Sequence, residues 1–527
     1  MSLQFKRHAA LVGALIVTIS LFIFGLGNTR VISYAINNKP LAAETPSHNY
    51  RNTQALFDES IVHQIQVIMP QKSYDMLIRT YQQTQEKDYF EADVIIDGVR
   101  INKVGIRLKG NASLRTAIDN ATNGAQRAAG GPPEGGGPPG GGPMSGCFVG
   151  NGNAQGGMPK PQAPPAGMPK PEFGGRGGGP GGDNDPTVPT AVPYLIKFDE
   201  FVKGQRYQGH TTLAIRNYGI SSNAAVLHEP LTYYAAHVLG IPAPGTAYAG
   251  VRFNDGAEKF YSLSSLVDED YLQAYFPKSS GVLYKAELGA NLKYNGEAPE
   301  NYSSCYDQKT RVKEADMRPI IDMIRFINQA DDATFERDLG NYFEIDSIIN
   351  YLALNNLLVN VDSLAGMGNN YYLYYNDQSK RFSLLLWDAN ESLGKLAGGA
   401  NAARYDLYYE GTNTGPAPAV NNAAAGANGA ALGGGPPMMN GENILKKRFL
   451  SNPTFRKRYE EALKKQYTAL FVNDAFTPQI TTYSNLVHRV NPTRPLVNID
   501  SYDKAVANVQ AFLNARKAFL QTVAVLQ

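Results

Sequence analysis

Two long segments rich in glycine and proline set the first limit on how this chain of 527 residues can fold. Residues from about 120 to 189 are dominated by Gly, Pro, Ala and Met and contain GGPPEGGGPPGGGPMSG, and residues from about 397 to 440 are of similar composition. Such sequences bury too little apolar surface to offset the conformational entropy lost on ordering them. We expect two disordered surface insertions. A lid, or a contact for a wall or coat polymer, is the alternative.

The N-terminus contains an uncharged apolar run, residues 9–27, which follows Lys6, Arg7 and His8. The run is long enough to cross a bilayer as a helix, which needs roughly 17–25 residues. Basic residues before such a helix favour export of the chain that follows it. We predict a signal-anchor over residues 1–30, a linker over residues 31–54 and an exported domain over residues 55–527. A signal cleaved near Ala43 is the alternative.

Several kinds of chemistry are disfavoured by the composition. The formal net charge is +2, so the chain offers no basic field for nucleic acid. The seven histidines show no H-x-x-x-H spacing, and no G-x-S-x-G motif supports a serine hydrolase. The two cysteines, Cys147 and Cys305, could pair in an oxidising compartment, but their spacing does not decide whether they do.

Without the two insertions, the chain has a strand-rich first half and a helix-rich second half. Runs such as Glu91–Ile96 and Thr211–Ile215 alternate or carry β-branched residues, as half-buried strands do. The run HEPLTYYAAHVLG has a helical period and a stop at Gly240, and Pro230 directly after Glu229 is typical of a helix start. The pattern predicts an α+β fold with two lobes and a cleft between them.

Two aspartates border a hairpin in the second half. Tyr371–Tyr375 and Arg381–Trp387 read as antiparallel strands joined by the turn NDQSK. Asp362 lies in a loop after a long apolar helix, and Asp388 lies where the second strand of the hairpin ends. The hairpin can therefore bring both acids to one point. Paired acids with nearby asparagines, and without Cys or His, suit a hard cation such as Mg²⁺ or Mn²⁺.

A loop Asp, a loop Asn and a hairpin ending in a second Asp resemble the catalytic segment of protein kinases. The chain more specifically resembles the CotH family of spore-coat-type atypical kinases. The motifs that carry this resemblance are VGIRLKGNASL, PYLIKFDEFVKGQRYQGHTTLAIRN, LHEPLTYYAAHVLGIPAPGTAYAGVRFND, VDEDYL, NYLALNNLLVNVDS, NNYYLYYN and LLWDANESLG, and FLNARKAFL resembles the closing helix of the family. The resemblance covers residues 55–527 without the insertions, and it implies a two-lobed atypical protein-kinase-like fold.

The resemblance implies a role for individual residues. Asp362 would be the catalytic aspartate and Asp388 the metal aspartate, while Lys197 would contact phosphate and Glu229 would be its ion-pair partner. Each could instead be structural: a surface lysine, a solvated acid of a first helical turn, or a loop acid. The further implied residues are Asn370 and Asn390 as metal ligands, and Arg107, Lys109 and Arg216 at the phosphates of ATP.

Two departures from the family pattern concern the metal. Asn369 stands where the family has histidine, and Asn390 stands where the family has a second aspartate. An asparagine carbonyl can bind a metal but brings no negative charge. Two functions therefore stay open. The first is an exported, membrane-anchored protein kinase that uses ATP and Mg²⁺ or Mn²⁺ to phosphorylate secreted or surface proteins. The second is a catalytically weak surface scaffold or adhesion protein.

Overall fold

The computed structural model describes residues 47–110, 114, 192–217, 225–277, 280–287, 289–314, 316–366, 368–408 and 443–527. The expected signal-anchor and the whole of the first insertion, residues 120–189, lie outside these residues. None of the helices within them is long and apolar enough to cross a membrane. Cys305 is buried and disulfide-bonded, whereas Cys147 lies outside the described residues.

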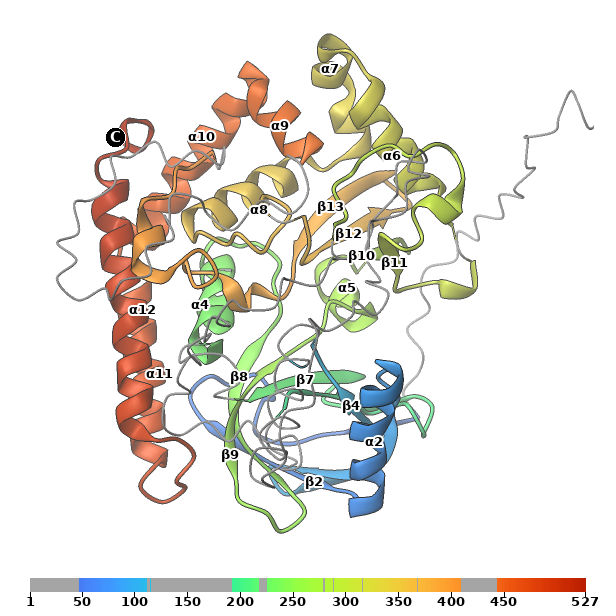
Figure 1. Cartoon of the computed structure of the whole chain (residues 1–527), viewed down its shortest axis with the longest axis vertical. Coiled ribbons are helices and arrows are strands. Elements are labelled where there is room, and N and C mark those ends of the chain that lie inside the picture. The colour runs from blue at the N-terminus through green and yellow to red at the C-terminus, as the bar shows by residue number, and fades with distance from the viewer. Residues whose placement is uncertain are drawn as a thin grey trace, which may run out of the picture. The chain divides into compact units, whose positions relative to one another are not determined.

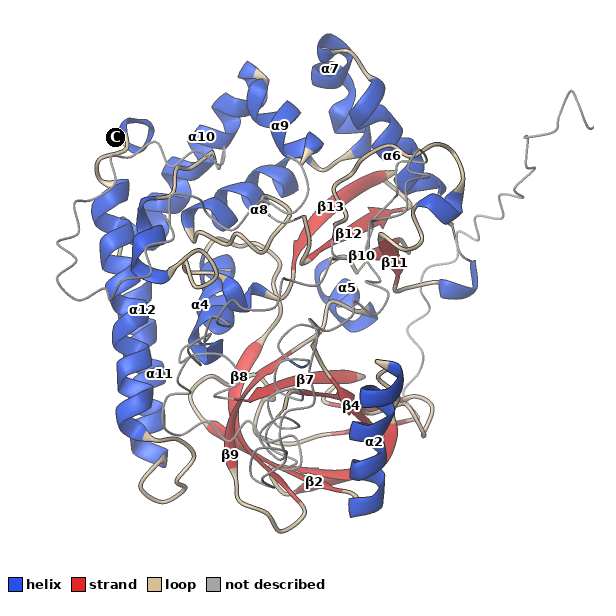
Figure 2. Ribbon diagram, viewed as in Figure 1, coloured by secondary structure: helices blue, strands red, loops and turns tan. Residues whose placement is uncertain are grey.

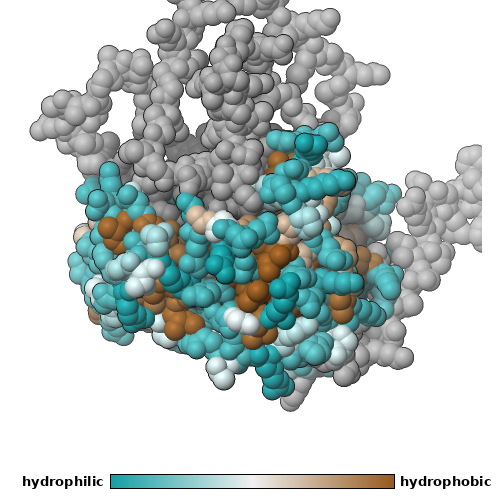
Figure 3. All heavy atoms as spheres, turned by 90° about the horizontal axis from the view of Figure 1, so that it is seen from below, coloured by the Kyte–Doolittle hydropathy of each residue, from teal (hydrophilic) through white to brown (hydrophobic). Residues whose placement is uncertain are grey.

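The first lobe is a closed β-barrel (Figures 1 and 2). Neighbouring strands are antiparallel except for the parallel pair of β2 and β8, and valine and isoleucine side chains fill the interior. The outer face of this lobe, seen from below in Figure 3, is mostly hydrophilic with separate apolar patches. In barrel order, the strands are β2 (Val62–Ile68), β3 (Phe90–Ile96), β4 (Val99–Leu108), β5 (Tyr194–Lys197), β7 (Thr212–Asn217), β9 (Lys259–Ser264) and β8 (Thr246–Phe253), and α2 (Gln71–Thr84) packs beside β3.

The folded domain begins before residue 55. Strand β1 (His48–Tyr50) pairs in parallel with β6 (Gln205–Tyr207). The side chain of Asn52 donates a hydrogen bond to the carbonyl oxygen of Asp97 at 3.2 Å. The expected linker over residues 31–54 is therefore wrong for its last residues. A three-residue strand that completes an edge of the fold is too short to show a periodic pattern.

Helix α4 (Ala225–Val238) connects the barrel strands β7 and β8 in the chain and is longer than the sequence predicts. Pro230 lies inside the helix instead of at its start, so Glu229 belongs to the second turn. A proline removes the hydrogen bond to the carbonyl four residues earlier, here that of Val226. The Tyr248 hydroxyl donates to this carbonyl at 3.2 Å, which supplies the missing partner.

The second lobe is built on a four-stranded antiparallel sheet of order β11-β10-β12-β13, with helices around it (Figure 2). The expected hairpin is confirmed as β12 and β13, and Asp388 follows its second strand. The strands are β10 (Val282–Ala286), β11 (Tyr306–Gln308), β12 (Tyr371–Asn376) and β13 (Arg381–Leu386). The helices are α5 (Glu269–Tyr275), α6 (Arg318–Gln329), α7 (Asp332–Tyr342), α8 (Ile345–Leu357), α9 (Ile444–Ser451), α10 (Pro453–Tyr467), α11 (Phe476–Val490) and α12 (Ile499–Leu520).

The segment between α11 and α12 joins the two lobes. The Arg494 guanidinium binds both carboxylate oxygens of Glu258, at 3.0 and 2.6 Å, beyond the end of β8. It also donates to the carbonyl oxygens of Val62 and His63 in β2, at 2.9 and 3.0 Å. A planar guanidinium suits such bidentate contacts. The C-terminal helices therefore hold the barrel as well as their own lobe.

The second insertion begins later in the chain than its composition indicates. Residues 399–404 form a 3₁₀ helix, η4 (Gly399–Arg404), in which Ala402 and Ala403 are buried, and Leu407 is buried after it. The expectation that residues 397–440 lie outside the core is therefore wrong up to residue 408. Alanine side chains are small enough to pack closely against a helix, so a segment rich in alanine can still belong to the core. Here η4 packs against α12.

A buried arginine of α12 holds this segment in place. Arg516 is fully buried, and its guanidinium donates to the carbonyl oxygens of Asn356 and Leu357 at 2.8 and 3.0 Å. It also donates to the carbonyl oxygen of Ala403 at 2.9 Å. Asn356 and Leu357 end helix α8, directly before the loop that carries Asp362. Arg516 therefore joins the end of α8, from which that loop starts, to η4.

We expect Arg516→Met to lower the free energy of unfolding by roughly 3–5 kcal/mol, because it leaves several buried carbonyl groups without their donor. Urea unfolding of the purified variant measures the change. Lys504→Met is the control, since Lys504 is exposed on the same helix. Equal stability of the two variants would contradict this role of Arg516.

Candidate active site

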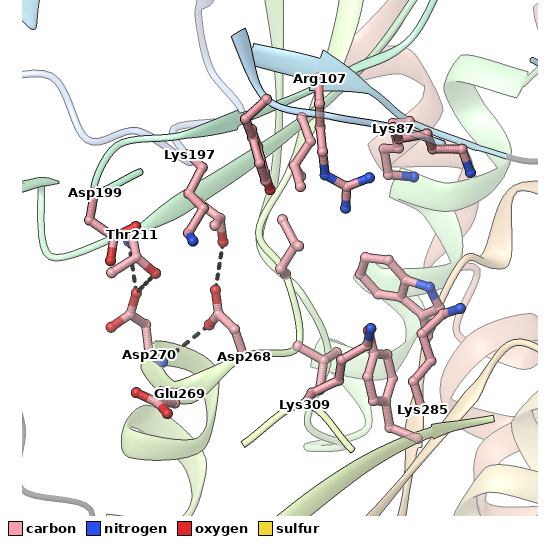
Figure 4. Close-up of a pocket in the computed structure, with 18 of the residues that line it drawn as sticks. Lys87, Arg107, Lys197, Asp199, Thr211, Asp268, Glu269, Asp270, Lys285 and Lys309 are labelled. Carbon is pink, nitrogen blue, oxygen red and sulfur yellow. Dashed lines mark hydrogen bonds between the residues drawn. The ribbon is translucent and has the colours of Figure 1, made fainter. Parts of the chain in front are cut away.

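A cavity of about 520 Å³ lies between the barrel and the sheet of the second lobe. Figure 4 shows the barrel residues Arg107 and Lys197 on one side and Lys285 and Lys309, from the second lobe, on the other. The segment after β9, with Leu266, Val267 and Asp268, and the start of α5, with Glu269 and Asp270, line one edge. The remaining lining residues are Lys87, Tyr89, Lys109, Gly110, Leu195, Asp199, Arg206, Thr211, Thr212, Tyr372, Trp387 and Asp388.

One end of the cavity gathers cations from both lobes. Lys87, Arg107 and Lys109 come from the barrel, and Lys285 comes from β10. The Lys109 ammonium lies 5.5 Å from the ring centre of Trp387, and Arg107 lies 5.2 Å from the ring centre of Tyr89. Burial, followed by the charges of Arg107 and Lys285, lowers the pKa of Lys87 to about 8. Cations that repel one another in this way favour binding of an anion.

Asp388 lies at this end and is held by an arginine. The Arg216 guanidinium donates to the Asp388 carboxylate at 2.6 Å and lies 3.8 Å from the carboxylate of Glu229 on α4. Burial opposes both charges, but Asp388 and Glu229 raise the pKa of Arg216, while Lys109 and Arg216 hold the pKa of Asp388 below its ordinary value. Asp388 also has a φ of 48°, a left-handed conformation that aspartate tolerates better than most residues.

The expected ion pair of Lys197 with Glu229 is wrong. The Lys197 ammonium binds the Glu200 carboxylate at 2.8 Å on the barrel side of the cavity, and Glu229 faces Arg216. The reason is topological, because β7 with Arg216, and not β5 with Lys197, is the strand that leads into α4. Arg216, and not Lys197, is therefore the strand cation that faces the helix glutamate. Lys197 still lines the cavity.

Asp362 is oriented by two asparagines. The side-chain amides of Asn369 and Asn370 donate to its two carboxylate oxygens at 2.9 and 2.7 Å. Burial raises the pKa of Asp362 to about 7, and the charges of Asp388 and Glu391 act in the same direction. The two aspartates are therefore electrostatic neighbours, as the hairpin predicts. Asp362 is not among the residues that line the cavity.

The donors beside these acids fit a hard divalent ion. The side-chain oxygen of Asn369 is buried and has no hydrogen-bond partner, which leaves an amide oxygen available to a cation. Asn390 donates through its amide to Glu391 at 2.7 Å, so its side-chain oxygen also stays an acceptor. No group of three or more His, Cys, Asp or Glu side chains suited to a metal occurs in the described part of the chain. The set suits Mg²⁺ or Mn²⁺ bound by few carboxylates and completed by phosphate oxygens.

The opposite edge of the cavity is acidic and joins the lobes. Asp268 caps α5 by accepting from the backbone amides of Asp270 and Tyr271, both at 3.1 Å. The hydroxyl of Thr212, on the barrel strand β7, donates to Asp268 at 2.6 Å. Burial, and then the charge of Asp270, raises the pKa of Asp268 to about 7. The hydrogen bond between Thr212 and Asp268 therefore joins the two lobes at this edge.

The sequence placed Arg107, Lys109, Lys197 and Asp388 at the site, and all four line the cavity. It assigned no role to three further lining residues, Lys87, Lys285 and Asp268. Lys87 precedes a strand and Lys285 lies within one, and neither belongs to a motif that marks phosphate binding. Asp268 lies in the motif VDEDYL, and an aspartate before an amphipathic turn is a typical N-cap.

Comparison with known proteins places the chain in a family. The family described as CotH kinase protein matches residues 191–520, which is more than half of the chain. The protein therefore belongs to the CotH kinase protein family, and the resemblance seen in the motifs is confirmed. The match includes Asp362 and Asp388 and begins after β4, so the structure is what places β2, β3 and β4 in the same barrel.

The similar proteins are distant. Inner spore coat protein H of Bacillus subtilis (strain 168) is 25% identical over 270 residues, which cover 50% of this chain and 64% of that relative, slightly less than two thirds of its length. The HipA structure from a toxin–antitoxin complex of Shewanella oneidensis MR-1 is 10% identical with a TM-score of 0.27, covering 60% of each chain. The proinflammatory kinase CtkA of Helicobacter pylori is 8% identical with a TM-score of 0.24, covering 59% of this chain and 91% of that one.

Asp268 gives a pH-dependent prediction. Because its pKa is raised to about 7 in the folded protein, the folded state holds a proton that the unfolded chain releases near pH 4. The stability that this proton provides is full below about pH 4 and is lost as the pH rises to about 7. Asp268→Asn stays neutral and keeps a capping side chain. The melting temperature of the variant, measured relative to that of the unchanged protein, should rise between pH 4 and pH 7 and then level off. A difference that does not change with pH would contradict this.

Proposed function

We propose that the protein is an ATP-dependent phosphotransferase that phosphorylates hydroxyl groups of proteins. Membership of a kinase family implies the use of ATP and a divalent ion in general. The observation that carries the proposal is the cationic end of the cavity, where Asp388 is fixed through Arg216 to Glu229. A polyanionic ligand fits there, and the half-buried Asp362 is an electrostatic neighbour of Asp388.

Each residue would have a defined part in the reaction. The triphosphate would lie against Lys87, Arg107, Lys109 and Lys285, with Arg216 keeping Asp388 in position. Asp362 would accept the hydrogen bond of the acceptor hydroxyl and orient it, because its two amide donors hold the carboxylate in one direction. A bound Mg²⁺ or Mn²⁺, held by Asp388 with Asn370 or Asn390, would neutralise phosphate charge.

The location and the acceptors extend this proposal. The apolar run of residues 9–27 supports an exported, membrane-anchored protein. One similar protein is named as a spore coat protein, which supports secreted or surface proteins of the coat type as acceptors. A catalytically weak scaffold remains the second candidate, because Asn369 and Asn390 stand where the family pattern has histidine and aspartate.

Asp362→Asn should separate catalysis from binding. The variant cannot orient or accept the hydroxyl proton, so transfer should fall about 100- to 10,000-fold. ATP affinity should stay nearly unchanged, because Asp362 does not line the cavity. The measurement is the transfer of labelled phosphate from ATP to the protein itself and to a serine-rich peptide.

The control is Asp346→Asn, an acid on α8 whose side chain is 81% exposed. It should transfer phosphate as the unchanged protein does. An Asp362→Asn protein with full activity would overturn the assignment of Asp362. Absence of transfer by the unchanged protein with either metal would favour the scaffold.

The anchor can be tested by cell fractionation. The full-length protein should sediment with membranes and resist salt extraction, because an apolar helix is held by the bilayer and not by charge. Removal of residues 1–30 should move it to the soluble fraction. A mature protein whose N-terminus begins near Ala43 would show instead that the segment is a cleaved signal.

A further inference from the structure

The excess of positive charge at the cationic end of the cavity is unusual for a site that relies on metal ions. Four cations, Lys87, Arg107, Lys109 and Lys285, line this end, and Asp388 is the acid that lines it with them. Lys285 also binds Glu287 at 2.6 Å, so part of its charge is balanced. Even so, positive charge is in excess where a nucleotide would place its phosphates.

The acidic side chains nearby are already engaged by protein groups. Arg216 donates to Asp388 at 2.6 Å. Glu391 accepts from Lys395 and from the Asn390 amide, both at 2.7 Å. An incoming cation would compete with these contacts. The carboxylate charge that usually attracts Mg²⁺ to a site is therefore partly balanced by side-chain cations in the described part of the chain.

We propose that the side-chain cations, and not divalent ions, provide most of the charge that holds the triphosphate, so that the site binds nucleoside triphosphate without metal. This inference rests on the proposed function for the identity of the ligand. Lysines act on phosphate as point charges, and Arg107 can bind two phosphate oxygens at once. Free triphosphate carries more negative charge than its metal complex, and it therefore gains more from four cations.

The arrangement also explains how the site can tolerate asparagine at position 390, where the family pattern has aspartate. In a metal-dependent site, loss of a carboxylate weakens the attachment of the nucleotide directly. In a site held by lysine and arginine, the nucleotide stays attached, and a metal ion would be needed for the transfer step more than for binding. Binding and transfer should therefore respond differently to removal of metal.

Isothermal calorimetry of the full-length protein tests this with ATP as the titrant. One series contains excess EDTA, and the others contain Mg²⁺ or Mn²⁺. We expect the Kd in EDTA to lie within about threefold of the Kd with metal. In EDTA, the double variant Lys87→Met with Lys285→Met should bind ATP at least about tenfold more weakly, because two charges facing the phosphates are removed. Thermal unfolding of the variant checks that it is folded.

The matched control is Lys293→Met, since Lys293 is exposed and does not line the cavity. It should bind ATP as the unchanged protein does. Binding that is detectable only with metal, or an unchanged Kd in the double variant, would overturn the inference and leave the phosphotransferase proposal intact. Binding in EDTA without phosphate transfer under any condition would support the inference and overturn the phosphotransferase. Absence of ATP binding in all series would overturn both.

Discussion

The buried guanidinium of Arg216 is the contact on which the geometry of the site depends. It lies between Glu229 on α4 and Asp388 at the end of the hairpin, and it comes from the barrel strand β7. Without it, two carboxylates would face each other in a poorly solvated place, which costs several kcal/mol. Ser392 extends this link, since its hydroxyl bonds the Thr232 hydroxyl of α4 at 2.6 Å. The segment after Asp388 is thus tied to α4 by a charged contact and a neutral one.

What the sequence predicts well is local. Alternation and β-branched residues predict strands such as β3, β7 and the hairpin of β12 and β13, and the structure confirms them. The hairpin also sufficed to place Asp362 and Asp388 near each other, because a strand pair with a short turn has little freedom. The CotH resemblance can also be recognised from local sequence. Its motifs are short runs whose order along the chain survives the insertions between them.

What the sequence does not predict depends on contacts between distant segments. Lys197 was expected to pair with Glu229 because both lie near family motifs, yet only the order of strands in the barrel shows that Arg216 faces the helix. Pro230 has the local features of a helix start, but Tyr248 from another strand supplies the hydrogen bond that lets the helix continue. Residues 399–404 likewise belong to the core because they pack against α12, and the composition of the segment does not reveal that contact.

The two ends of the cavity differ in charge, and this difference determines how a nucleotide could lie in it. Asp199, Asp268 and Asp270 stand at the edge where the chain crosses between the lobes, whereas Lys87 and Lys285 stand at the other end (Figure 4). Arg206 pairs with Asp270, Lys197 lies beside Asp199, and burial raises the pKa of Asp268 to about 7, so the first edge carries little net charge. Phosphates would therefore be attracted to the second end. An uncharged base, by contrast, can use the apolar side chains of Leu266 and Val267 beside the acidic edge. The electrostatics therefore favour one direction of binding, with the terminal phosphate toward Asp388.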